Sequence, residues 1–92
     1  MLYEWDEQKC VDNVSKHGLH FADAEQVFEG QTVTFEDTRS DYGEPRFITF
    51  GLLVTRLVVI AHTPRSDKTR IISMRKGNER EQKYYEKRLK TT

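Results

Sequence analysis

The stretch RFITFGLLVTRLVVIAHTPRSDKTRIISMR, residues 46–75, decides the fold. It contains three segments rich in Val, Ile and Phe, residues that favour strands, and only short turns separate them. Turns this short join antiparallel neighbours, because a parallel crossover needs a dozen or more residues. The stretch therefore predicts an antiparallel meander with strands at 46–54, 56–63 and 69–75.

A fourth strand is expected immediately before this meander. Polar and apolar residues alternate in TVTFED (32–37), which is typical of a strand with one buried face, and TRSDYGEP (38–45) has the composition of a loop. The N-terminal LYEW (2–5) alternates weakly and can form a short strand of its own. The economical arrangement is a sheet of four antiparallel strands.

The N-terminal third predicts a helical hairpin. Asp6 is a suitable N-cap for a helix over 7–17, and Gly18 can end that helix in the left-handed conformation. A second short helix is expected over 21–28, ended by Gly30. Helical spacing places three residues of the first helix on one face: Cys10, Val14 and His17.

A basic helix closes the chain. Gly77 breaks the last strand, and Asn78 with Glu81 three positions later forms a capping-box variant for a helix over 79–90. Tyr85 and Leu89 are spaced to pack on the sheet. We therefore expect one α+β domain over residues 1–92, with an N-terminal helical hairpin, a four-stranded antiparallel sheet and a C-terminal basic helix.

Composition limits the possible classes of function. The 92 residues are 36% hydrophobic and 33% charged, which suits a globular domain. A run of 18 apolar residues is absent, and the first residues are acidic where a signal peptide would be basic, so a cytoplasmic protein is expected. Cys10 is the single cysteine, and Cys/His spacings of the zinc-finger kind are missing, so we expect no metal and no cofactor.

The zero net charge hides a division along the chain. Residues 1–45 carry three Lys/Arg against eleven Asp/Glu, whereas residues 46–92 carry twelve against four. Such asymmetry indicates a basic surface that faces a polyanion. The alternative is that the two halves neutralise each other across the fold.

Several residues of the basic half suit chemistry on a phosphate. A guanidinium group can donate hydrogen bonds to two oxygens of one phosphate. Alternation along the last strand places Arg70 and Arg75 on opposite faces of the sheet. His62 ends the most apolar strand just before Arg65, and we expect His62, Arg65, Arg75 and the last helix to converge at one end of the sheet. The alternative for His62 is a hydrogen-bonded residue at the sheet rim. Tyr84 or Tyr85 can stack on an unpaired base.

RNA can be cut without metal when its own 2′-hydroxyl attacks the adjacent phosphorus, with a base, an acid and positive donors supplied by the protein. A two-metal nuclease instead needs convergent carboxylates, and the acidic residues here cluster in the other half. The expected site therefore contains no metal. It comprises catalytic His62, Arg65, Arg75 and Tyr84, and RNA contacts from Arg46, Arg70, Ser73, Arg80 and Lys83.

Five blocks in order, YEWDEQK, KHGLHFADAEQVF, RFITFG, VVIAHTPR and RIISMRKGNEREQKYYE, resemble the BrnT family of bacterial type II toxins. The resemblance implies a RelE-like ribonuclease fold, RNA cleavage that inhibits translation, and neutralisation by a BrnA-type antitoxin. Two positions depart from the family pattern, His20 and Met74. The residues that match the family's motifs are His62, Arg65, Ser73, Arg75, Glu79 and Tyr84.

The resemblance also implies the partners. A heterotetramer formed through the antitoxin's own dimer is expected, with operator DNA bound only through the antitoxin, and no membrane. In this interpretation Arg65 and Arg75 bind the scissile phosphate and His62 is acid or base. Two other functions stay open: a non-catalytic module that binds RNA or a partner, and an operon co-repressor that acts with its antitoxin.

Overall fold

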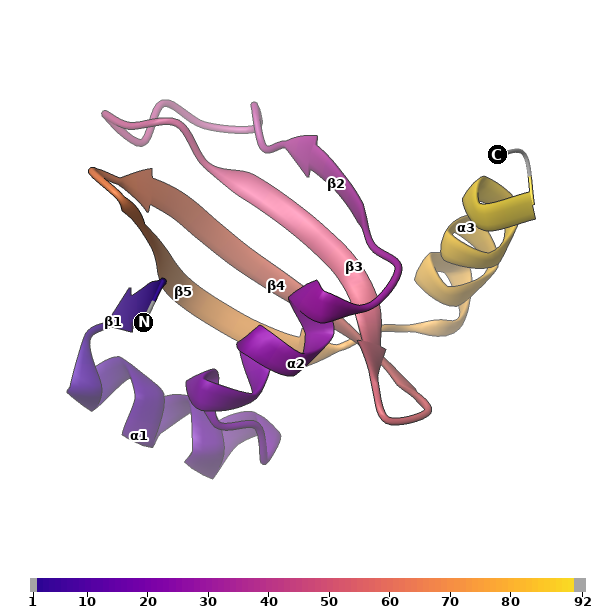
Figure 1. The fold of residues 1–92 in the computed structure, drawn as a ribbon, viewed down its shortest axis with the longest axis horizontal. Coiled ribbons are helices and arrows are strands. Elements are labelled where there is room, and N and C mark those ends of the chain that lie inside the picture. Colours follow the sequence, from indigo (N-terminus) through magenta and orange to yellow (C-terminus); the bar gives the residue numbers. More distant parts are fainter. Residues whose placement is uncertain (1, 91–92) are drawn as a thin grey trace.

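The protein, described over residues 2–90 by a computed structural model, is built on one five-stranded sheet in the order β1-β5-β4-β3-β2 (Figure 1). The strands are β1 (Tyr3–Trp5), β2 (Val33–Glu36), β3 (Phe47–Leu53), β4 (Arg56–Arg65) and β5 (Lys68–Lys76). The helices are α1 (Glu7–His17), the 3₁₀ turn η1 (Phe21–Asp23), α2 (Ala24–Glu29) and α3 (Glu79–Lys90). None of the helices within residues 2–90 is long and apolar enough to span a membrane.

The prediction of a four-stranded, wholly antiparallel sheet is wrong. The strand-prone LYEW does form a strand, but β1 joins the sheet beside β5 and runs parallel to it, with Tyr3 opposite Thr69 and Trp5 opposite Ile71. The sheet is therefore mixed. The sequence of a three-residue strand does not indicate which strand it pairs with or in which direction, because both depend on where α1 and α2 pack.

The antiparallel meander of β2, β3, β4 and β5 is confirmed. One irregularity was not visible in the sequence. Ala61 pairs with Ser73 but His62 pairs with Ile71, so Ile72 is an extra residue in β5. This bulge reverses the alternation of β5 side chains between the two faces of the sheet.

As a result, Ile71 and Met74 both pack into the core beneath α1. Arg70 precedes Ile71 and is paired with Glu4, a residue flanked by Tyr3 and Trp5, which pack against the same core. Arg70 and Arg75 therefore share the face of the sheet opposite α1, where simple alternation had separated them.

Two apolar clusters lie on the two faces of the sheet. The larger one, beneath α1 and α2, contains Phe21, Val27 and Ile60. The smaller one lies beside α3, where Tyr85 packs with Val33, Phe50, Leu57 and Val59. The Tyr85 hydroxyl donates to the Gln31 carbonyl at 2.7 Å, so this side chain helps to attach the last helix to the sheet.

The helix ends agree with their predicted caps. The Asp6 carboxylate accepts from the Lys9 amide at 3.0 Å, and Gly18 ends α1 with φ of 71°. Asn78 and Glu81 each accept from the other's amide, which confirms the capping box of α3.

The buried face of α1 differs from the predicted one. Cys10 is buried, but Val14 is 41% exposed and the buried neighbour is Asn13. Its side-chain amide donates to the Leu19 carbonyl at 2.9 Å and accepts from the Met74 amide at 3.2 Å. Because Asn13 satisfies two backbone groups that α1 would otherwise bury unpaired, a polar residue replaces an apolar one here.

Candidate functional site

A cleft of about 400 Å³ lies on the face of the sheet opposite α1, between the loop after β2 and the start of α3. Its floor is formed by side chains of β3, β4 and β5, and two arginines from distant parts of the chain lie in its wall. We call it the arginine cleft. The residues used below are Asp37, Arg39, Phe50, Ser73, Arg75 and Glu81.

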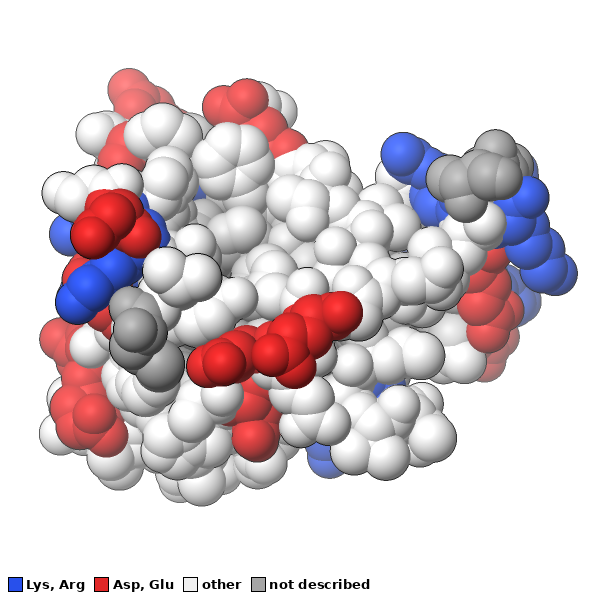
Figure 2. All heavy atoms as spheres, viewed as in Figure 1, with Lys and Arg blue, Asp and Glu red and all other residues white. Residues whose placement is uncertain are grey.

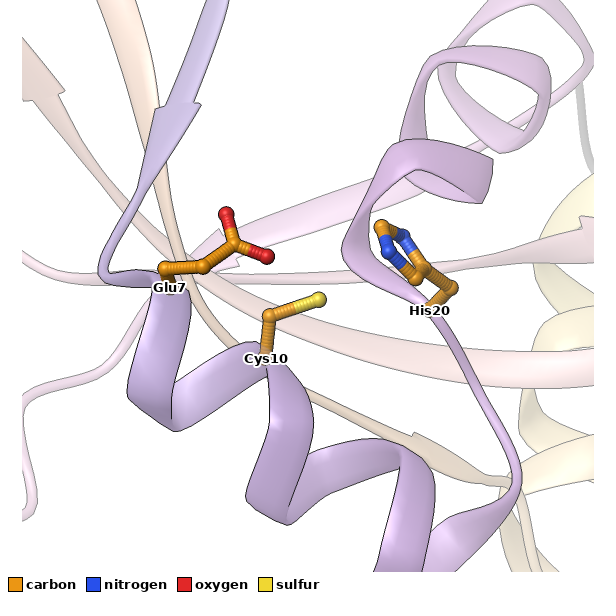
Figure 3. A group of neighbouring side chains, drawn as sticks. All are labelled: Glu7, Cys10 and His20. Atoms are coloured by element: carbon orange, nitrogen blue, oxygen red, sulfur yellow. The ribbon is translucent and has the colours of Figure 1, made fainter.

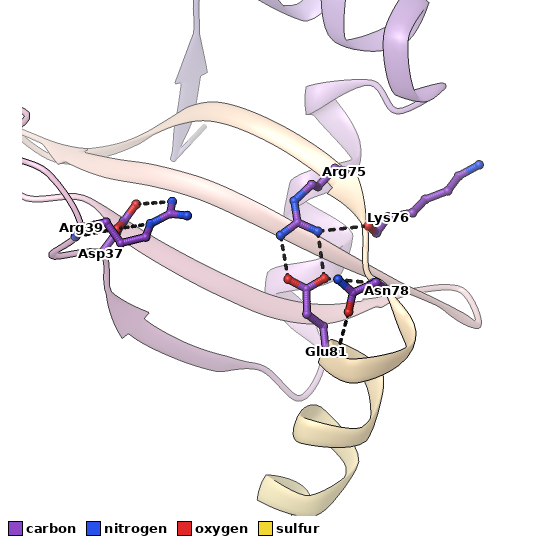
Figure 4. Close-up of polar contacts among 6 residues, drawn as sticks. All are labelled: Asp37, Arg39, Arg75, Lys76, Asn78 and Glu81. Carbon is purple, nitrogen blue, oxygen red and sulfur yellow. Dashed lines mark hydrogen bonds and ion pairs between the residues drawn. The ribbon is translucent and has the colours of Figure 1, made fainter.

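Arg75 projects from β5 and is held by the first turn of α3 (Figure 4). Two nitrogens of its guanidinium contact the two carboxylate oxygens of Glu81 at 2.8 and 2.7 Å. This paired hydrogen bond raises the pKa of Arg75 against opposing effects of burial and of the nearby Arg39. Glu81, whose pKa Arg75 lowers, also caps α3, so one carboxylate ties the cleft to the helix.

Arg39 forms a second pair of this kind with Asp37. Its Nε and Nη2 contact the two carboxylate oxygens at 2.8 Å each, and the Tyr42 hydroxyl donates to the same carboxylate at 3.1 Å. The hydrogen bonds from Arg39 hold the pKa of Asp37 far below its usual range. Asp37 is buried, whereas the side chain of Arg39 is 77% exposed.

Arg39 was missed by the sequence analysis because it is an isolated cation in the acidic half of the chain. The only signal was its position in a loop rich in Ser, Asp and Gly, since such loops often carry functional side chains.

An apolar hollow of about 280 Å³ adjoins the arginine cleft. It is lined by Phe35, Phe50, Arg80, Glu81 and Tyr84, of which Phe35, Phe50 and Glu81 also line the cleft. The Phe50 ring lies edge-on to Phe35 at 5.5 Å and to Tyr84 at 5.8 Å between centroids. We call this feature the aromatic hollow.

His62 lies on the other face of the sheet. Its ring packs edge-on against Phe28 of α2 at 5.1 Å, stacks near Phe47, and shares a 2.7 Å hydrogen bond with the Thr49 hydroxyl. Burial lowers the pKa of His62 to about 4, so the ring is neutral at pH 7. These contacts match the alternative reading of His62 as a hydrogen-bonded residue.

Three other predicted arginines lie toward the opposite end of the β4–β5 hairpin from Arg75. Arg65 and Arg46 both pair with Glu44, at 3.1 and 3.7 Å, and Arg70 pairs with Glu4 at 2.9 Å. The structure therefore brings Ser73, Arg75, Arg80 and Tyr84 to the arginine cleft or the aromatic hollow. It does not bring Arg46, His62, Arg65 and Arg70 there, and Lys83 forms an exposed pair with Glu79 at 3.5 Å.

Glu7, Cys10 and His20 form a group with potential metal-ligand atoms within 4.8 Å of one another (Figure 3). Sequence spacing did not reveal it, because its members come from two segments. The Cys10 sulfur accepts from the Phe21 amide at 3.4 Å, and Nδ1 of His20 accepts from the Ala22 amide at 3.0 Å. Because the hydrogen bond from Ala22 occupies the one ring lone pair of a neutral His20 that a metal would need, the group is interpreted as the support for the start of η1.

The charge division of the sequence is visible on the surface. Figure 2 shows Lys and Arg gathered over α3, and Asp and Glu over α2. Both sequence readings apply in part, because Glu4 and Glu44 of the acidic half pair with arginines of the basic half.

Fold and cleft together define a small α+β domain with a guanidinium-lined site suited to a phosphate group. The chain belongs to the BrnT family, described as "Ribonuclease toxin, BrnT, of type II toxin-antitoxin system", whose pattern it matches over residues 5–81. It is thus a ribonuclease toxin of a type II system, a class that acts with an antitoxin. No curated protein matches the chain.

Proposed function

We propose that the arginine cleft is the active site of a metal-independent endoribonuclease that inhibits translation. The observation that carries this proposal is the convergence of Arg39 and Arg75 on one cleft. Arg39 is held by Asp37 of its own loop, and Arg75 by Glu81 in the first turn of α3. Two cations this close repel each other unless an anion lies between or beside them. The phosphate of an RNA chain can replace the carboxylates on both.

The cleavage step uses the RNA's own 2′-hydroxyl. Its oxygen forms a bond to the adjacent phosphorus, and the bond from phosphorus to the 5′-oxygen breaks. The 5′-oxygen takes a proton from water and leaves as a hydroxyl, and a 2′,3′-cyclic phosphate remains. Arg75 and Arg39 stabilise the charge that gathers on the phosphoryl oxygens. Glu81, displaced from Arg75 by the phosphate, accepts the proton of the 2′-hydroxyl, and Ser73 donates a hydrogen bond at the cleft floor.

The carboxylates of the cleft support a reaction without metal. A two-metal site needs carboxylates that are free to bind cations. Here Asp37 and Glu81 are each engaged by two nitrogens of an arginine, at distances of 2.7 to 2.8 Å. The negative charge of both carboxylates is therefore paired with guanidinium groups and is not free to bind a metal ion.

The partner in this proposal is a BrnA-type antitoxin. By covering the arginine cleft with acidic or apolar side chains it would exclude RNA, and its own dimer would join two toxins in a heterotetramer that reaches operator DNA through the antitoxin. The exposed guanidinium of Arg39 and the cations over α3 give such a partner a basic surface to bind.

The test uses toxin freed of antitoxin, labelled RNA and EDTA. We expect fragments that end in 2′,3′-cyclic phosphate, and a loss of rate on the order of 100-fold or more for Arg75→Ala and Arg39→Ala. Arg65→Ala is the matched control and should cleave normally, because Arg65 lies at the other end of the hairpin. Cleavage that survives Arg75→Ala and Arg39→Ala but is lost in Arg65→Ala would contradict the proposal. If the wild type left RNA intact both with and without ribosomes, binding without cleavage would be the remaining function of this surface.

A further inference from the structure

The aromatic hollow is open to solvent although its walls are apolar. Phe35 is 41% exposed and Tyr84 is 39% exposed, whereas Phe50, which contacts both rings, is 5% exposed. Large aromatic side chains exposed around one concave site are unusual on a monomer and mark a binding surface. The hollow is therefore a site that folding alone does not explain.

The position of the hollow limits what can occupy it. It shares Phe35, Phe50 and Glu81 with the arginine cleft, so an occupant lies beside the group held at Arg75. Arg80 adds a positive charge at its edge. A ligand that spans both features is anionic at one point and flat and apolar at the next.

We propose that the aromatic hollow binds one unpaired nucleobase of the RNA, next to the phosphate bound by Arg75 and Arg39. This inference rests on the proposed ribonuclease function and defines the substrate class as single-stranded RNA. A base inside a duplex is stacked and paired, so it cannot enter the hollow without being extruded. A single strand offers its bases freely.

The chemistry of the hollow also predicts how much sequence it reads. Stacking on aromatic rings tolerates every base, because each base has a π-face, and the lining residues offer few groups for base-edge hydrogen bonds. Arg88 donates to the Tyr84 hydroxyl at 2.8 Å and its guanidinium lies over the Tyr84 ring, 5.7 Å from the centroid, so this contact fixes the ring and covers part of one face. The base at this position therefore contributes affinity with weak sequence preference.

The experiment measures affinity for a short single-stranded RNA made uncleavable by 2′-O-methyl groups, with one abasic nucleotide moved along the chain. For the wild type, one abasic position should weaken binding roughly tenfold. Phe35→Leu, which keeps an apolar side chain in β2, should lose a similar factor on intact RNA and lose nothing further at that abasic position. Phe35→Tyr should bind normally, and Val11→Ala, an exposed residue on α1, is the matched control.

Three results would overturn the inference. One is Phe35→Leu with unchanged affinity for intact RNA. Another is equal affinity for single-stranded and duplex RNA. The third is a Phe35→Leu variant that loses antitoxin affinity alone, which would make the hollow a seat for an antitoxin side chain. Failure of the proposed function is distinguishable from failure of this inference by Arg75→Ala. This variant removes a phosphate contact, so it should weaken binding of intact RNA and of abasic RNA alike.

Discussion

His62 and Arg75 lie on opposite faces of the β4–β5 hairpin. The His62 ring packs under α2 against Phe28, whereas the Arg75 guanidinium lies in the arginine cleft against Glu81 of α3. The sheet itself separates the histidine from the arginine that the sequence had grouped as catalytic partners. Their roles should therefore separate in experiment.

Replacing His62 should affect folding and leave the chemistry intact. We expect His62→Gln to retain the wild-type cleavage rate within about threefold, because the ring does not line the arginine cleft. A fall of 100-fold or so with an unchanged melting temperature would instead place His62 in the catalytic machinery. Single-turnover cleavage and thermal unfolding, measured on the same preparation, decide between the two.

The buried His62 also predicts a pH dependence of stability. Its pKa falls from 6.5 in the unfolded chain to about 4 in the folded one, so the unfolded chain binds more protons between these values. The part of the free energy of unfolding that depends on neutral His62 is fully present above pH 6.5. It is lost as the pH falls toward 4, by an amount on the order of 2 kcal/mol. Urea unfolding at pH 7.5 and pH 5 should show the loss in wild type and less of it in His62→Gln.

Glu81 should affect binding and cleavage in opposite directions. Glu81→Gln keeps the cap of α3 but removes the charge that competes with phosphate for Arg75, so an uncleavable RNA should bind a few-fold more tightly. Cleavage of ordinary RNA should fall on the order of 100-fold, because the proton acceptor is lost. Glu79→Gln removes the same charge from the same helical turn and serves as control. Tighter binding with an undiminished rate would show that Glu81 only competes with phosphate.

Asn13 should matter more to stability than any apolar residue exposed on α1. Asn13→Ala leaves the Leu19 carbonyl and the Met74 amide without their buried partner. We expect a loss of about 2 kcal/mol in the free energy of unfolding, or roughly 10 °C in melting temperature. Ser15→Ala, an exposed change on the same helix, is the control, and an equal effect of the two changes would contradict this account.

The β3–β4 turn should be open to improvement. Val54 has a φ of 58°, a left-handed conformation that is strained for a β-branched residue, and its side chain is 77% exposed. Val54→Gly should raise the free energy of unfolding by about 0.5 to 1 kcal/mol. Ser66→Gly, at a φ of 53° in the next turn, should gain less because serine is not β-branched. A melting temperature lowered by Val54→Gly would contradict the prediction.

The local elements could be predicted because their causes are local. The apolar segments of residues 46–75, with short turns between them, determined the antiparallel meander, and the side chains of Asp6, Asn78 and Glu81 determined helix ends through hydrogen bonds three residues away. Arg75 was recognised as a candidate phosphate ligand by its residue type and its place beside the basic helix. These inferences needed no knowledge of distant contacts.

The tertiary structure alone decided the direction of β1, the bulge at Ile72 and the partners of Arg65 and Arg70. A strand of three residues takes its partner from the packing of the helices that follow it, and one extra residue in β5 reverses which side chains face the cleft. Sequence order could not place Arg39 beside Arg75 or His62 away from it. Alternation and spacing report only which neighbours along the chain share a face, whereas a site is made by side chains that meet across the sheet.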